Sequence, residues 1–180
     1  RRFFKEGDWL ASQLMANHTS LTGEAAVSSA GGEIDFSNPD IQEALEIVRT
    51  PSSDKRWVVL GYEGNTGRLK VVETGEGGLE DLADELSEGK IHYCLWRAIE
   101  GQAPKFVYIC WVGEGVPAVK KGLVNTHGHI VGKQVMKHFH VQINARDEDD
   151  LDEQSVLAKV KSAAGADYDA GHPGGVIVGK

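Results

Sequence analysis

Hydrophobic residues follow two different spacings along the chain, and each spacing predicts one kind of element. Between Ile41 and Val48 they recur every three to four residues, which predicts a helix. The preceding Ser37-Asn38-Pro39 is typical of a helix start, and this helix is expected to end near Arg49. Elsewhere, β-branched and aromatic residues gather in short runs bounded by turn-forming residues, which is typical of strands. These runs predict five strands, over residues 56–62, 69–74, 90–99, 105–112 and 138–144.

Three further helices are expected. A short one over residues 79–86 follows a glycine-rich turn, and an acidic lead-in opens a last helix that ends near Ala164. The longest helix is predicted over residues 117–136, with Pro117 in its first turn. Its apolar residues cover an arc of about 160°, which implies packing across a sheet. They are Val119, Leu123, Val124, Ile130, Val131 and Val135. The opposite face is a polar strip, defined as Lys121, Asn125, Gly128, His129 and Gly132.

The order of these elements predicts an α/β (α+β) fold. Helices would cover both faces of a mixed five-stranded sheet, whose third and fourth strands pair as an antiparallel hairpin. Residues 1–33 are expected to form a disordered extension, because residues 16–33 are small, polar and rich in glycine, serine and alanine. The first fourteen residues either form a short amphipathic helix or are vector-derived and precede a natural start at Met15. The folded domain is predicted over residues 34–168, with a flexible tail over 169–180.

Composition narrows the class of protein. A chain of 180 residues, 41% hydrophobic and 26% charged, fits one ordinary globular domain. Apolar runs are far shorter than the roughly 18 residues of a membrane span, so a soluble cytoplasmic protein is expected. The net charge of −8 argues against general binding to nucleic acid or anionic membranes. The two cysteines, Cys94 and Cys110, lie in predicted strands and are expected to be free core residues in a reducing compartment.

Three kinds of site chemistry can be weighed from the residues. The turn ETGEGG precedes a helix, as a phosphate-binding loop does, but Glu80 stands where the dinucleotide fingerprint needs a third glycine. His127 and His129 diverge on a helix, and they do not converge with His138 and His140 as four metal ligands. Neither a P-loop triplet nor a Gly-x-Ser-x-Gly nucleophile motif occurs. We therefore expect no cofactor, no metal ion and no catalytic residue.

Three segments together resemble a known family. They are WVVLGYEGNTGRLKVVETGEGGLEDLADEL, KFVYICWVGEGVPAVKKG and HVQINARDEDDLDEQSVLAKVKSAAGADY. On these segments the chain is similar to the actin-depolymerising-factor homology (ADF-H) domain, specifically its drebrin and drebrin-like branch. The resemblance implies a gelsolin/cofilin-like fold, with a mixed sheet of about five or six strands sandwiched by about four helices. It also implies a monomeric, non-catalytic module of the cortical actin cytoskeleton that binds actin, with filaments preferred over monomers.

The resemblance places the actin site on the long helix and on two other regions. The helix would contribute Pro117, Lys120, Lys121, Asn125 and Gly128. The segment Phe36-Ser37, before the first helix, would flank this site. A second surface, which would touch a neighbouring actin subunit, falls near Lys105 and Arg146.

One departure from the family pattern affects the expected activity. Severing members carry two basic residues two positions apart after the proline, whereas here the first of these positions is Val119 and the basic pair is Lys120-Lys121. Adjacent helical residues point about 100° apart, so the two lysines cannot share a face, and Lys121 is the stronger candidate. We therefore expect side binding to filaments. Cofilin-like severing, or a protein-interaction domain of this fold that binds no actin, are the alternatives.

Overall fold

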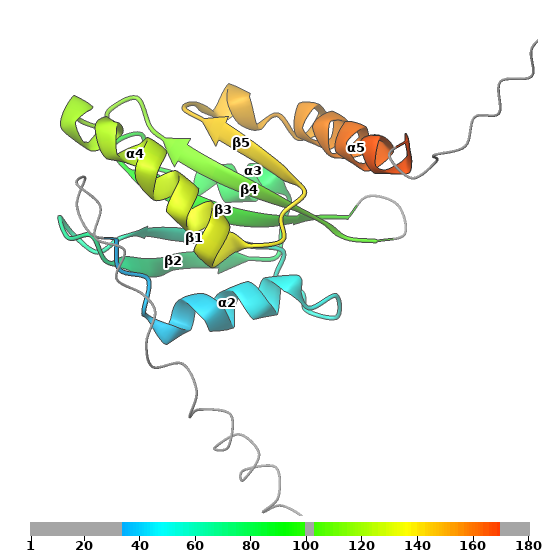
Figure 1. Ribbon diagram of the computed structural model, residues 1–180, viewed down its shortest axis with the longest axis horizontal. Coiled ribbons are helices and arrows are strands. Elements are labelled where there is room, and N and C mark those ends of the chain that lie inside the picture. The colour runs from blue at the N-terminus through cyan, green and yellow to red at the C-terminus, as the bar shows by residue number, and fades with distance from the viewer. Residues whose placement is uncertain (1–33, 100–102, 170–180) are drawn as a thin grey trace, which may run out of the picture.

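The computed structural model describes residues 34–99 and 103–169, which fold around one sheet (Figure 1). The elements in chain order are the helix α2 (Pro39–Arg49), the strands β1 (Trp57–Tyr62) and β2 (Leu69–Gly75), the helix α3 (Leu79–Asp84), the strands β3 (Ile91–Ala98) and β4 (Lys105–Val112), the helix α4 (Ala118–Ile130) with its π-helical continuation η1 (Val131–Met136), the strand β5 (Val141–Ala145), the short 3₁₀-helix η2 (Glu148–Leu151) and the helix α5 (Glu153–Asp169). The extension predicted over residues 1–33 lies outside the described residues, as does the predicted tail apart from Asp169.

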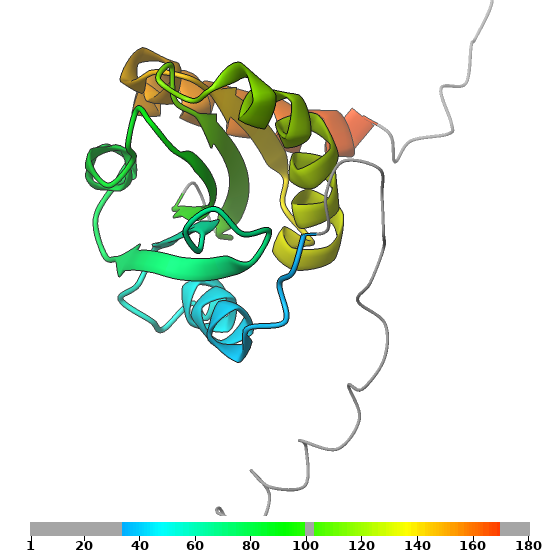
Figure 2. The ribbon, with the colours of Figure 1, turned by 90° about the vertical axis from the view of Figure 1, so that its left-hand side faces the viewer.

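The sheet has the strand order β2-β1-β3-β4-β5. Its neighbouring strands pair antiparallel, including the predicted hairpin of β3 and β4, except that β4 and β5 are parallel. Helices α2 and α4 cover one face, where Leu45 and Val124 belong to the same core as Tyr108. Helices α3 and α5 cover the other face, where Leu82 and Val156 belong to a second core, and Figure 2 shows α3 and α4 on opposite sides of the sheet. The predicted fold class is confirmed.

Two element boundaries differ from the predicted ones. The fifth strand begins at Val141 rather than at residue 138. Lys137 and His138 adopt left-handed backbone conformations, with φ of 32° and 49°, and turn the chain before strand pairing begins. The helix α5 continues past its predicted end to Asp169. The alanines around Gly165 favour a helix and offset the cost of the glycine, which is about 1 kcal/mol.

The long helix predicted over residues 117–136 is confirmed in extent, as α4 followed directly by η1. The last six residues are π-helical, which the sequence analysis does not predict. Arg49 of α2 donates hydrogen bonds from Nη2 to the carbonyl oxygens of Met136 and Lys137, the second at 3.1 Å. Carbonyl groups at a helix end have no partners within the helix, so Arg49 supplies them and fixes the end of the long helix to α2.

Candidate functional site

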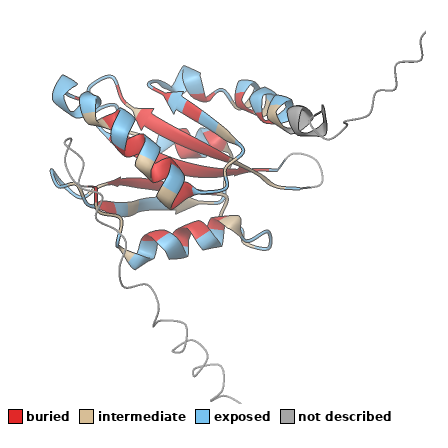
Figure 3. Cartoon of the chain, in the orientation of Figure 1, coloured by how far each residue is buried: buried red, intermediate tan, exposed pale blue. Residues whose placement is uncertain are grey.

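The N-terminal half of α4 is exposed, whereas η1 is largely buried against the sheet (Figure 3). Val119 in the first turn is 85% exposed, and Lys120 and Lys121 beside it are exposed as well. Leu123 lies one turn further along and is half-buried, so the two apolar side chains form a short ridge. The expectation that Val119 packs on the sheet is therefore wrong. An apolar ridge next to two ammonium groups is a surface suited to a protein partner.

The helix is rotated relative to the predicted arc, and its glycines explain why. Gly128 and Gly132 lie on the buried face of the long helix, where they face Tyr108. A Cβ atom on Gly132 would lie 3.1 Å from Tyr108 Cε1, and Tyr108 Oη donates a 2.9 Å hydrogen bond to the Gly128 carbonyl oxygen. The aromatic ring fills the space that two side chains would need. The prediction that both glycines lie on the polar face, opposite the sheet, is therefore wrong. Gly128 only lines the wall of a groove between α4 and β5.

The turn before α4 fixes where the exposed half begins. Gly113 packs so closely that a Cβ atom there would lie 2.1 Å from the Glu88 carbonyl oxygen, and Val116 is buried. Pro117 then accepts hydrogen bonds at its carbonyl oxygen from the backbone N–H groups of Lys120 and Lys121, at 2.9 and 3.1 Å. The first turn of α4 contains no acidic residue. Two cations at the positive end of a helix dipole are unfavourable for the helix alone, and a bound carboxylate would offset that cost.

The two lysines point to different sides of the helix, as predicted from their adjacency. Lys120 Nζ donates a 2.9 Å hydrogen bond to Asn65 Oδ1, in the turn between β1 and β2. Lys121 Nζ donates a 3.0 Å hydrogen bond to the carbonyl oxygen of Glu114, in the turn before α4. Neither lysine forms an ion pair with another described residue. Both ammonium groups are therefore oriented without being neutralised.

A polar groove of about 700 Å³ runs between α4 and β5, and we name it the α4–β5 groove. Its polar lining residues are Glu114, Lys121, Asn125, His129, Gln142, Asn144 and Arg146. Arg146 follows β5, and because β5 is parallel to β4 its end lies beside the start of α4. Lys105 stands at the first residue of β4 and therefore lies at the opposite end of the sheet. The structure thus brings Arg146 to Lys121 and Asn125, and separates it from Lys105.

A chain of buried polar groups ties α4 to the sheet. Tyr62 Oη lies 2.6 Å from His127 Nδ1 and 2.8 Å from Tyr93 Oη. His127 is 3% exposed, and burial raises the pKa of Tyr62 to about 12, so the phenol is neutral near pH 7. From the sequence, His127 is expected to be relevant only as a candidate metal ligand. Its spacing from Val124 and Val131, at three and four residues, is the signal that places it on the buried stripe.

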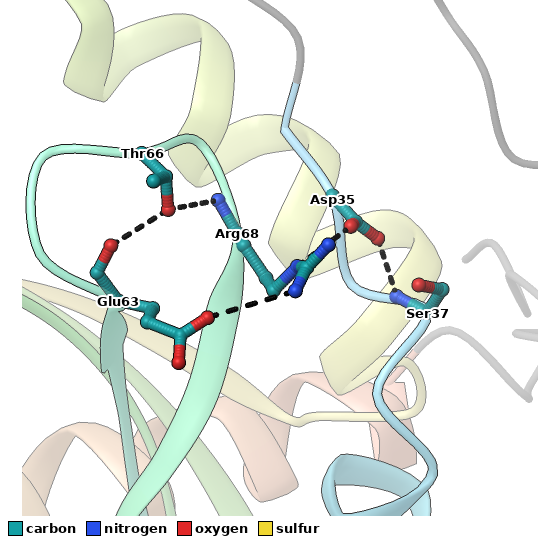
Figure 4. A network of polar contacts seen from close by, with 5 residues as sticks. All are labelled: Asp35, Ser37, Glu63, Thr66 and Arg68. Carbon is teal, nitrogen blue, oxygen red and sulfur yellow. Dashed lines mark hydrogen bonds and ion pairs between the residues drawn. The ribbon is translucent and has the colours of Figure 1, made fainter.

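The segment before α2 is fastened to the hairpin of β1 and β2 (Figure 4). Asp35 forms a short parallel bridge with Arg68, whose Nε lies 3.2 Å from Asp35 Oδ2, and Arg68 also lies 3.8 Å from Glu63 Oε2. Hydrogen bonding by Ser37, more than the nearby Arg68, lowers the pKa of Asp35. Ser37 is exposed here, and Phe36 packs against the core. This segment therefore supports the hairpin whose turn holds Lys120.

The described residues were also searched for metal sites, reactive cysteines and membrane-spanning helices. No group of three or more His, Cys, Asp or Glu side chains there is placed to hold a metal ion. His127 is buried and His129 exposed, so they face different environments. Cys94 and Cys110 are free and buried, and burial raises the pKa of both thiols. Within the part of the chain that the structure describes, no helix is both long and apolar enough to span a membrane.

Comparison with known sequences gives a consistent result. The family model of the cofilin/tropomyosin-type actin-binding proteins matches residues 33–161. The drebrin-like protein of Mus musculus is 42% identical over 132 residues, which cover 72% of this chain and 30% of that protein. Coactosin of Entamoeba histolytica is 33% identical over 129 residues, which cover 68% of this chain and 86% of coactosin. The chain thus spans less than a third of the drebrin-like protein it matches.

Comparison with solved structures agrees with the comparison of sequences. The crystal structure of coactosin from Entamoeba histolytica matches with a TM-score of 0.67 and 29% identity, over 75% of this chain and 99% of that one. The cofilin homology domain of a yeast actin-binding protein, ABP1P, matches with a TM-score of 0.64 and 27% identity, over 71% of this chain and 98% of that one. Both likenesses extend over almost the whole of the solved chains.

Proposed function

Because the chain belongs to the family of cofilin/tropomyosin-type actin-binding proteins, we propose that it binds the side of actin filaments through the exposed half of α4. It acts as a monomeric, non-catalytic module of the actin cytoskeleton in the cytoplasm and at the cell cortex. Drebrin-like proteins and coactosins support this proposal as relatives, and the exposed half of α4 offers a surface for a protein partner.

The observation that carries the proposal is the exposure of Val119 beside two lysines. An isolated exposed valine is common on protein surfaces, but here it continues into Leu123 and is flanked by oriented ammonium groups. Apolar residues at the centre of an interface supply the contact area, and the charged residues around them supply orientation and association rate. The half-helix therefore combines both parts of a docking surface.

Charge distribution supports an acidic partner. The chain carries a net charge of −8, yet Lys120, Lys121 and Arg146 gather around the start of α4. Such a local concentration steers an acidic partner to one face, and the steering weakens as salt rises because the Debye length shortens to about 8 Å at 0.15 M. We assign Pro117, Lys120, Lys121 and Asn125 to the primary contact, and Arg146 to its border.

Co-sedimentation with filamentous actin tests the proposal. The wild type is compared with Lys120→Ala/Lys121→Ala and with Val119→Ser, at low and moderate salt and at actin concentrations up to about 50 µM. A matched control is Lys55→Ala/Lys133→Ala, which removes the same charge from positions outside the described grooves. We expect the wild type and the control to pellet alike, and both test variants to lose about tenfold in affinity while remaining folded. A wild type that stays in the supernatant would contradict the proposal.

A further inference from the structure

A second pocket lies on the other side of α4, at the end of the sheet where β1 stops and β3 starts. It has a volume of about 530 Å³. The turn between β1 and β2, the first residues of β2, the loop before β3 and the first turn of α4 form its walls. We name it the lysine pocket, because Lys70, Lys90 and Lys120 all line it.

The lysine pocket is uniformly basic. Its three lysines are exposed, and none of the described residues that line it is acidic. Lys120 is oriented by its 2.9 Å hydrogen bond to Asn65, which also lines the pocket. In a chain with a net charge of −8, three ammonium groups around one cavity are a local feature that suits an anionic group.

A buried imidazole on the pocket wall points the same way. His92 lines the pocket and is 2% exposed, and its ring interacts with the backbone of Leu60. Burial, with a contribution from Lys90, lowers the pKa of His92 to about 4, so the ring is neutral near pH 7. A neutral imidazole can still donate one hydrogen bond to a carboxylate oxygen.

The lysine pocket is continuous with the proposed docking surface. Lys120 belongs to the exposed half of α4 and to the pocket at the same time. A smaller cavity that holds Leu123 shares Tyr62, Asn65 and Lys120 with it, so the surface runs from the apolar ridge to β2 without interruption. A partner that covers the ridge therefore also covers the mouth of the pocket.

We propose that the lysine pocket receives acidic side chains of the actin filament, as an anchoring site separate from the face of Lys121. The proposal rests on the proposed function. Lys70 and Lys90 pair with the carboxylates, and Lys120 connects this anchor to the docking helix. Free anions and lipid surfaces are the alternative ligands of this pocket. Lys70 and Lys90 line the pocket but do not belong to α4, so they distinguish it from the helix site.

The test measures filament affinity for Lys70→Gln/Lys90→Gln, which removes two charges of the pocket and leaves α4 unchanged. The matched control is Lys55→Gln/Lys133→Gln, and thermal unfolding checks that every variant is folded. Co-sedimentation at two salt concentrations is expected to show about a tenfold loss of affinity for the pocket variant and less than about a twofold loss for the control. The pocket variant should also show a weaker dependence of affinity on salt, since fewer charge pairs remain to be screened.

The possible results separate the two proposals. If the wild type binds filaments and the pocket variant binds equally well, the inference about the lysine pocket is wrong while the helix site stands. Equal weakening of the pocket variant and the control would also overturn it, because net charge alone would explain both. If the wild type does not bind, the proposed function falls and the inference falls with it.

Discussion

His92 should make the stability of the fold depend on pH. The ring is buried, and its pKa is lowered from 6.5 to about 4 by burial and by Lys90. Between these two values the unfolded chain binds a proton that the folded chain does not bind. Acidification therefore favours unfolding, and the penalty begins as the pH falls below about 6.5 and is complete below about 4.

The size of the effect follows from the shift. One pKa unit corresponds to about 1.4 kcal/mol, so the full penalty for His92 is about 3 kcal/mol. Because the transition is gradual, about 2 kcal/mol of it should appear between pH 7 and pH 5. This is a substantial fraction of the free energy of unfolding of an ordinary domain, which is about 5–15 kcal/mol.

Urea unfolding at pH 7, 6 and 5 measures the effect, with His92→Phe and His92→Asn as variants that cannot titrate. Other groups titrate in the wild type and the variants alike, so their contributions cancel in the comparison. We expect the wild type to lose about 2 kcal/mol more than either variant between pH 7 and pH 5. The exposed His129, replaced by Phe, is the control for the loss of a histidine elsewhere on the fold. Parallel pH curves for the wild type and both His92 variants would refute the reasoning.

Two further predictions concern how α4 is held. Tyr62→Phe removes the hydrogen bonds to His127 and Tyr93, and should lower the free energy of unfolding by about 1–3 kcal/mol, measured by the urea midpoint. An unchanged midpoint would show that this buried chain does not contribute to stability. Gly113→Ala drives a Cβ atom into a backbone carbonyl group and should cost about 2 kcal/mol or more, whereas Gly89→Ala, with open space around it, should cost far less. Equal losses in a thermal melt would contradict the packing argument.

Local chemistry accounts for the elements that the sequence predicts well. The cap at Asn38, whose side chain accepts a hydrogen bond from the backbone N–H of Asp40, starts α2 where the motif indicates. The alternation of apolar residues and the turn at Gly64 place β1 and β2 within a residue or two of their observed ends. These features depend on neighbours in the sequence, and the sequence contains the information needed to locate them.

The candidate site depends on contacts that are distant in the sequence, and there prediction fails. Arg146 joins Lys121 only because β5 pairs parallel to β4, which no local pattern indicates. Val119 is exposed because the buried face of the helix is centred near Gly128. Its hydrophobicity alone leads to the opposite expectation, that it is buried. The lysine pocket joins residues from four elements, so its members cannot be recognised as a group from their positions in the chain.

The contact between the long helix and Tyr108 has a consequence for how this fold can diverge. The ring of Tyr108 sets the spacing between helix and sheet, and a Cβ atom on Gly132 would come within 3.1 Å of it. The two positions therefore share one fixed volume, and a larger residue at 132 requires a smaller one at 108. Such a paired exchange would preserve the helix-to-sheet distance and with it the height of Val119 above the surface. Either substitution alone would leave a close contact or a cavity between the helix and the sheet, so lineages should explore these two positions together rather than one at a time.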